Sequence, residues 1–150
     1  MKKRYKIWPH IFILTCSCLF FSNYIFPSPC LTADITIIVN KDVPDEVLSK
    51  EDIKQIFLGK KKKWKDNTPI TVVLGKTGEA QMVLLMNYVE RTPSQFNNVW
   101  KRLVFTGEAS FPRSFSDDKK IIEFVASKKG AIGYVTAGGF SNSIKVIRTE

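Results

Sequence analysis

Residues 56–73 read IFLGKKKKWKDNTPITVV, and this stretch contains the end of a helix, a turn and a buried strand. Its first two residues continue an apolar helical face. Gly59 suits the position after a helix, because glycine adopts a left-handed backbone at little cost. Residues 66–69 have turn chemistry, and the β-branched residues 70–74 predict a strand. A helix that leads through a turn into a buried strand is typical of an α/β fold.

The four lysines at residues 60–63 allow two interpretations. They follow the end of the predicted helix, where positive charge suits the negative end of the helix dipole. A solvated helix end is therefore the favoured interpretation. The alternative is that the basic run, residues 60–65, binds an anionic lipid or polysaccharide surface.

Residues 1–33 differ from the rest of the chain. Residues 1–6 carry four positive charges and no acid, residues 7–26 are almost wholly apolar, and a helix-breaking Pro-Ser-Pro segment then leads to small residues. This order predicts a secretory signal peptide over residues 1–33 and one domain over residues 34–150, in the periplasm. The alternative is an inner-membrane anchor formed by residues 7–26, because about 20 apolar residues can span a bilayer.

The cysteines and the histidine restrict the chemistry of residues 34–150. Cys16, Cys18, Cys30 and His10 are the only residues of these two types, and all four fall inside the predicted leader. The remaining domain has no disulfide framework, no Cys or His nucleophile and no Cys/His zinc site. The sequence therefore predicts a protein that is not an enzyme and that has no metal and no cofactor.

The charge of the chain also depends on the leader. The whole chain has 23 Lys and Arg residues against 14 Asp and Glu residues. Four of the basic residues lie in the leader, so the domain keeps 19 basic and 14 acidic residues, a net charge of +5. A modest positive charge favours a small anion or an anionic surface as partner, and we expect no nucleic acid.

Capping residues and apolar spacing predict four helices. Ser49, Thr92 and Ser116 have N-cap chemistry, and Thr92 has a Gln three residues later, as in a capping box. The polar loop at residues 75–79 precedes the remaining helix. The apolar residues at helical spacing, which we expect in the core rather than in a cofactor site, are Ile53, Ile56 and Phe57, then Met82, Leu85, Met86 and Val89, then Phe96, Val99, Trp100 and Leu103, and finally Ile121, Ile122 and Val125.

Four strands alternate with these helices, at residues 35–39, 70–74, 131–135 and 144–147. Alternation of this kind predicts an α/β fold in three layers, with a mixed or mostly parallel sheet flanked by helices. In such sheets ligands bind beyond the carboxyl ends of the strands, near helix N-termini.

Three stretches together point to a family. They are LSKEDIKQIFLGKKKKWKDNTPITVV at residues 48–73, NNVWKRLVFTGEASFPRSF at residues 97–115 and KKGAIGYV at residues 128–135. In their order and spacing the chain resembles the periplasmic phosphate-binding proteins of ABC transporters, in particular their short single-lobe relatives. The resemblance implies one lobe of a type II periplasmic-binding-protein fold. It also implies phosphate or a related oxyanion as ligand, and an ABC permease or another envelope protein as partner.

The resemblance also implies candidate ligand residues. In the polar loop, Thr77 would offer its hydroxyl, Gly78 its backbone N–H and Lys76 a positive charge to an anion at the helix N-terminus. In a second loop, Arg113 would clamp the anion and Thr106 would be a further ligand residue. Two alternatives stay open, in which Thr77 is a plain N-cap and Arg113 a surface arginine.

The loop at residues 75–79 departs from the family pattern, because the RSDGSGT string of phosphate binders is absent. This departure supports a second hypothesis from another class. In that hypothesis the lobe has no ligand and serves as an accessory or interaction module of the cell envelope.

Overall fold

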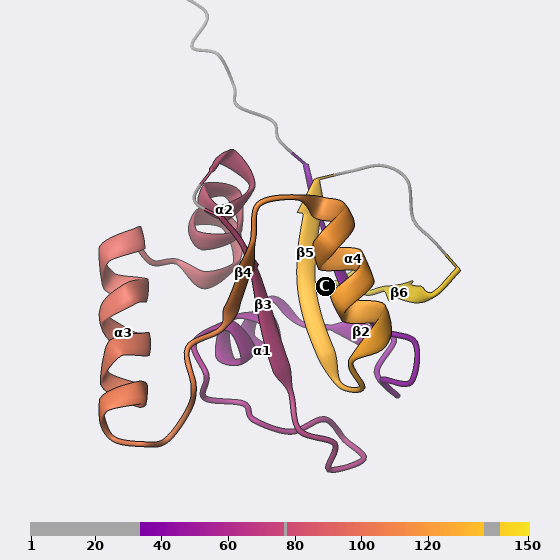
Figure 1. Ribbon diagram of the computed structural model, residues 1–150, viewed down its shortest axis with the longest axis horizontal. Helices are drawn as coiled ribbons and strands as arrows, with labels where there is room; N and C mark the ends of the chain where they lie inside the picture. The colour runs from indigo at the N-terminus through magenta and orange to yellow at the C-terminus, as the bar shows by residue number, and fades with distance from the viewer. Residues whose placement is uncertain (1–33, 77, 137–141) are drawn as a thin grey trace, which may run out of the picture. The chain divides into compact units, whose positions relative to one another are not determined.

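A five-stranded sheet lies at the centre of the part of the chain that the computed structural model describes, which is residues 34–76, 78–136 and 142–150 (Figure 1). The predicted leader (residues 1–33), Thr77 and residues 137–141 lie outside the described residues. Within the described residues, no helix has the length and apolar character needed to cross a bilayer.

The sheet is mixed, as the sequence predicted. Its strand order is β4-β3-β5-β1-β6. Strand β3 pairs in parallel with both β4 and β5, whereas β1 pairs antiparallel with β5 and β6. The bounds of these strands are β1 (Ile35–Asn40), β3 (Thr71–Gly75), β4 (Arg113–Phe115), β5 (Ala131–Thr136) and β6 (Ile144–Val146).

Three short strands were not predicted. Strand β4 occupies part of a segment that we expected to be a loop, and it forms one edge of the sheet. Strands β2 (Val47–Leu48) and β7 (Arg148–Thr149) form a separate parallel pair. Strands of two or three residues carry too little alternation for periodicity to reveal them.

Side chains of the central strands alternate between two cores, which gives three layers. Val72 and Leu74 belong to the core on one face, whereas Val73 belongs to the core on the other face. The helix α4 (Asp118–Ser127) covers the Val73 face. The elements α1 (Lys50–Phe57), α2 (Glu79–Leu84), the π-helix η1 (Leu85–Val89) and α3 (Pro93–Phe105) contribute to the core on the opposite face.

Two of the predicted helix caps are confirmed and one is wrong. The Ser49 hydroxyl accepts the Asp52 N–H at 3.1 Å, and Thr92 forms the complete capping box with Gln95. The cap of α4 is Asp117 rather than Ser116, because the Asp117 carboxylate accepts the Lys119 N–H at 2.9 Å. Both residues have N-cap chemistry, so the sequence placed the helix start one residue too early.

The predicted apolar stripe that contains Met82 and Met86 is wrong for these two residues. Both methionines are exposed, at 43% and 60%, whereas Leu84, Leu85 and Val89 are buried. Met86 lies in the π-helix η1, where i→i+5 bonding moves side chains out of the α-helical spacing. Met82 lies in α2, before η1, so this change of geometry does not account for its exposure.

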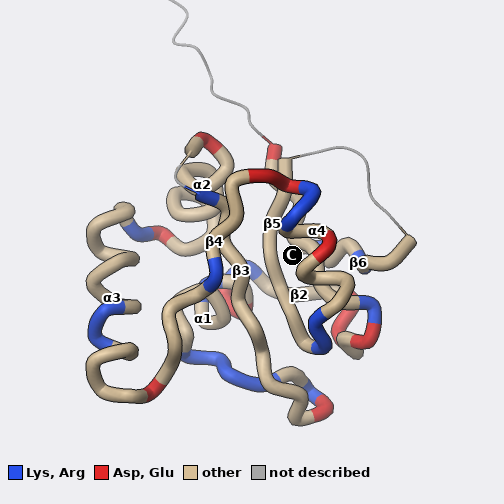
Figure 2. The backbone as a smooth tube through the Cα atoms, viewed as in Figure 1, with Lys and Arg blue, Asp and Glu red and all other residues tan. Residues whose placement is uncertain are grey.

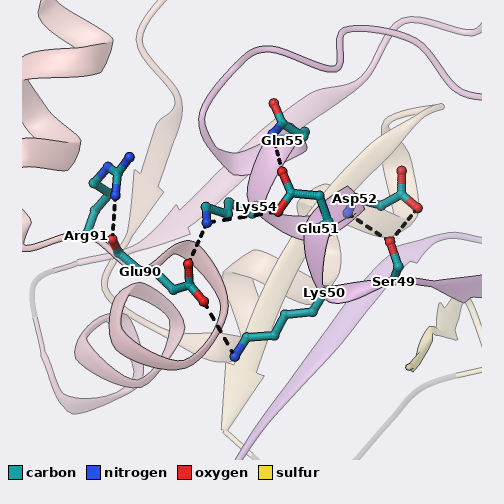
Figure 3. A network of polar contacts seen from close by, with 8 residues as sticks. All are labelled: Ser49, Lys50, Glu51, Asp52, Lys54, Gln55, Glu90 and Arg91. Carbon is teal, nitrogen blue, oxygen red and sulfur yellow. Dashed lines mark hydrogen bonds and ion pairs between the residues drawn. The ribbon is translucent and has the colours of Figure 1, made fainter.

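Charged side chains tie α1 to the end of η1 (Figure 3). Glu90 adopts a left-handed backbone at φ 55° and ends η1. Its carboxylate pairs with Lys54 and Lys50, which project from α1. The Lys54 ammonium lowers the pKa of Glu90, chiefly by donating a hydrogen bond to it.

Trp64 and Trp100 are both buried, which fits packing residues rather than ligand-stacking residues. The Trp64 indole N–H donates to the carbonyl of Gly130 at 3.0 Å, and the Trp100 indole N–H donates to the carbonyl of Phe57 at 3.0 Å. These bonds fix the segment after α1 to the start of β5, and α3 to the end of α1.

Candidate functional site

Two hollows lie at opposite ends of β3. The first borders the carboxyl end, at Gly75 and Lys76, and has a volume of about 240 Å³. The second borders the amino end, at Thr71 and Val72, and has a volume of about 600 Å³. We call them the Lys76 pocket and the Arg113 groove.

Four polar side chains line the Lys76 pocket, and they come from four elements. Lys76 directly follows β3, Gln81 lies on α2, Asn97 on α3 and Ser114 on β4. The parallel register pairs Ser114 with Leu74, so Ser114 faces the same side of the sheet as that buried leucine. The backbone N–H of Lys76 donates to the carbonyl of Phe115 at 2.7 Å, which fixes the point where Lys76 leaves the sheet.

All four side chains can donate hydrogen bonds, and no carboxylate lines the pocket within the described residues. In the same part of the chain, none of the four side chains has a hydrogen-bond or ion-pair partner. The pocket therefore combines one ammonium, two amides and one hydroxyl that are free to bind a ligand. This arrangement is chemically suited to an oxyanion.

Tyr134 hydrogen-bonds to Gly75 at the carboxyl end of β3, next to the Lys76 pocket. Its phenol oxygen accepts the N–H of Gly75 at 3.0 Å, and its side chain is only 1% exposed. Burial raises the pKa of Tyr134 to about 12. The phenol is therefore neutral at physiological pH and adds no negative charge beside Lys76.

We expect the raised pKa of Tyr134 to make stability fall in strong alkali. A phenol whose pKa is higher in the folded state stabilises the fold below about pH 10, and this contribution disappears as the pH rises through about 12. The loss should be about 2–3 kcal/mol in the free energy of unfolding. Urea titrations at pH 8, 10 and 11.5 measure it. Tyr134→Phe should remove this part of the pH dependence, and an equal slope in both proteins would contradict the assignment.

The helix that follows the pocket loop begins at Gly78. Gly78 is the N-cap of α2, with extended backbone and no side-chain cap hydrogen bond. The interpretation of Thr77 as a plain N-cap is therefore wrong by one residue, and the side chain of Thr77 lies outside the described residues. Lys76 directly follows β3 and lines the pocket, whereas Gly78, the N-cap of α2, is not one of the residues that line it.

The other two predicted ligand residues lie elsewhere. Arg113 lines the Arg113 groove, with its guanidinium carbon 5.5 Å from the centre of the Phe124 ring. Thr106 is the C-cap of α3, and its hydroxyl contacts the carbonyls of Arg102 and Leu103 and the carboxylate of Glu108. Thr106 borders neither hollow, so the structure does not join these two residues to Lys76 in one cavity.

Figure 2 shows the lysine run as a basic stretch of the chain. Within the described residues, three of its five lysines pair with carboxylates. Lys61 contacts Asp52 at 2.7 Å, Lys62 lies 3.8 Å from Glu108, and Lys65 lies 3.1 Å from the buried carboxylate of Asp45. The hydrogen bond from Lys61 is the main cause that lowers the pKa of Asp52. The run follows the helix end as predicted, but these pairs reduce the charge that it offers to an anion.

Sequence reasoning missed Gln81, Asn97 and Ser114. Each is a common polar residue within a predicted helix or loop, and no local motif marks it. Only the pairing of β4 with β3, and the position of α3 beside that edge, bring them together (Figure 1).

The comparisons place the chain in a family. A family model described as a PBP superfamily domain matches residues 20–146, so the chain belongs to this family. The match begins within the segment that we predicted as a leader. A comparison with curated proteins gives no match. The family resemblance that the sequence indicated is thus confirmed.

Solved structures with the same fold include phosphate receptors. An ABC-type phosphate transport receptor from Vibrio cholerae aligns with a TM-score of 0.60 and 18% identity, over 77% of this chain and 45% of that chain. A phosphate ABC transporter substrate-binding protein with bound phosphate from Clostridium perfringens aligns with a TM-score of 0.60 and 22% identity, over 77% and 44%. PstS from Borrelia burgdorferi aligns with a TM-score of 0.56 and 18% identity, over 77% and 46%. The chain spans less than half the length of these receptors.

Proposed function

We propose that this protein is a periplasmic solute-binding domain that binds phosphate or a related oxyanion in the Lys76 pocket, for ABC-type transport. The observation that carries the proposal is the set of four unpartnered donor side chains around a pocket without a carboxylate. The family match and the phosphate receptors with the same fold support it. The binding role, the periplasmic location after removal of residues 1–33, and an ABC permease as partner are parts of this proposal.

The chemistry of the pocket suits a tetrahedral anion. Lys76 supplies a charge-assisted hydrogen bond, which is about twice as strong as a neutral one. Ser114, Gln81 and Asn97 add neutral donors from three other directions. We propose no catalytic step, because binding needs only these donors.

We expect Lys76→Met to weaken phosphate binding by about tenfold or more. A hydrogen bond to a charged group contributes about 1.5–3 kcal/mol, and 1.4 kcal/mol corresponds to a tenfold change in the dissociation constant. Isothermal calorimetry with inorganic phosphate measures the effect. Lys63→Met is the matched control, because Lys63 is equally exposed but lines neither hollow. Equal losses in both variants would show that only net charge matters.

One observation favours a second candidate, a ligand-less accessory module of the envelope. The loop at residues 75–79 lacks the RSDGSGT string of phosphate binders. If the folded protein gives no heat with millimolar phosphate, the ligand-binding proposal fails and this candidate replaces it. Recovery of a specific envelope protein in a pull-down would then identify its partner.

A further inference from the structure

The Arg113 groove exists because β4 is shorter than β3. The two strands pair only from Val73 and Arg113 onward, and Pro112, which has no N–H to donate, stands directly before the first pair. Thr71 and Val72 therefore lie at an open edge of the sheet, next to a hollow of about 600 Å³. This volume lies within the range of small-molecule sites.

The groove has an apolar lining held in place by the core. Ile56 and Val72 are buried core residues, and Trp100 is fixed by its hydrogen bond to the carbonyl of Phe57. The Phe111 ring lies tilted beside Trp100, with ring centres 6.2 Å apart, and it is 47% exposed. A ligand over these side chains would cover apolar surface that the protein now leaves in water.

Some of the positive side chains that line the groove pair with carboxylates, and others do not. Lys61, Lys62 and Glu108 also line it, but Lys61 pairs with Asp52, and Lys62 lies 3.8 Å from the carboxylate of Glu108. Within the described residues, Arg113 and Lys128 have no carboxylate partner. Arg113 lies over the face of Phe124, a contact that leaves the in-plane N–H donors of its guanidinium available.

We propose that the Arg113 groove is a binding site for a small amphiphilic organic anion. The apolar body of the ligand, an aromatic or branched group, packs against Trp100 and Phe111. Its carboxylate, sulfonate or phosphate head binds Arg113 and Lys128. The charged groups of this site lie at the opposite end of β3 from Lys76, although Phe111 borders both hollows. The proposal does not depend on the proposed binding of inorganic phosphate.

The test compares two dyes with closely related ring systems. It uses the full protein as its expression host secretes it. The dye 8-anilinonaphthalene-1-sulfonate has the sulfonate, whereas N-phenyl-1-naphthylamine lacks it. We expect the sulfonate to bind at one site with a rise in fluorescence, and the neutral dye to bind about tenfold more weakly or worse, because it cannot form charge-assisted hydrogen bonds. Near-UV circular dichroism must show fixed tertiary structure, so that dye binding to partly unfolded protein is excluded.

Arg113→Met should weaken binding of the sulfonate dye about tenfold and leave the weak binding of the neutral dye unchanged. Lys128→Met is the second variant and should act in the same direction, which keeps the test open if Arg113→Met does not fold. Arg102→Met is the matched control, because Arg102 is exposed on α3 and does not line the groove. Unchanged sulfonate binding in folded variants, or equal losses in the control, would overturn the proposal.

A competition experiment with inorganic phosphate distinguishes this proposal from the proposed function. We expect millimolar phosphate to leave dye binding unchanged, and Lys76→Met to have no effect on it. Displacement of the dye by phosphate would overturn the claim of a separate site. Dye binding in a protein that does not bind phosphate would leave this inference intact while the proposed function failed.

Discussion

Asn40→Asp should destabilise the folded protein by about 3–5 kcal/mol at pH 7, the cost of an unpaired buried charge. The Asn40 amide is 2% exposed and donates to the carbonyls of Val125 and Ala126, at 2.8 and 2.9 Å. Both carbonyls belong to the last turn of α4, which has no helical N–H to satisfy them. The substitution keeps the shape, removes both donors and places a negative charge at the negative end of the helix dipole.

Urea unfolding followed by circular dichroism measures this effect. The deficit should shrink in acid, because the buried environment favours the protonated carboxyl and this form can donate one hydrogen bond. Asn98→Asp makes the same chemical change at an exposed position of α3. It should alter the free energy of unfolding by no more than about 0.5 kcal/mol. Equal effects at the two positions would contradict the role of Asn40 as the link between β1 and α4.

Gly130→Ala should cost about 3 kcal/mol or more, from backbone strain and a steric clash together. Gly130 has a φ of 73°, and a Cβ atom at this position would lie 2.3 Å from the carbonyl oxygen of Pro69. The carbonyl of Gly130 also accepts the N–H of Thr71 at 3.1 Å and the indole N–H of Trp64 at 3.0 Å. Moving this backbone to relieve the clash would break the junction between β3 and β5.

Gly107→Ala separates the strain from the clash. Gly107 has a φ of 71°, close to that of Gly130, but a Cβ atom there would meet no atom within 4 Å. Its replacement should cost only about 1–2 kcal/mol, the ordinary penalty for a left-handed alanine. The same urea titration compares the two variants. If both lost the same stability, the contact with Pro69 would not be the cause.

The sequence was most informative where local chemistry decides the structure. Ser49 and Thr92 cap helices because their hydroxyls can accept backbone N–H groups within the next turn, whatever the rest of the chain does. Gly59 has a φ of 71°, as its place after α1 predicted. The three layers followed from buried strands that alternate with helices. The prediction for Met86 was wrong because a π-helix has no signature in α-helical spacing.

The candidate site could be predicted only in part, because it depends on pairing between distant segments. Lys76 was found because it follows a strand, which is a local pattern. Ser114 joins it only through the register of β4 on β3, and Asn97 only through the packing of α3. The same register sends Arg113 to the Phe124 side, away from Lys76. No property of residues 106–113 alone indicates that separation.

The most direct test of the central claim, that the Lys76 pocket binds an oxyanion, is a crystal structure of the protein soaked in phosphate. We predict tetrahedral density within hydrogen-bond distance of the side chains of Lys76 and Ser114, and of the amide of Gln81 or Asn97. The density should be lost in Lys76→Met crystals soaked in the same way. An empty Lys76 pocket in phosphate-saturated crystals, or phosphate bound only at other surfaces, would contradict the account.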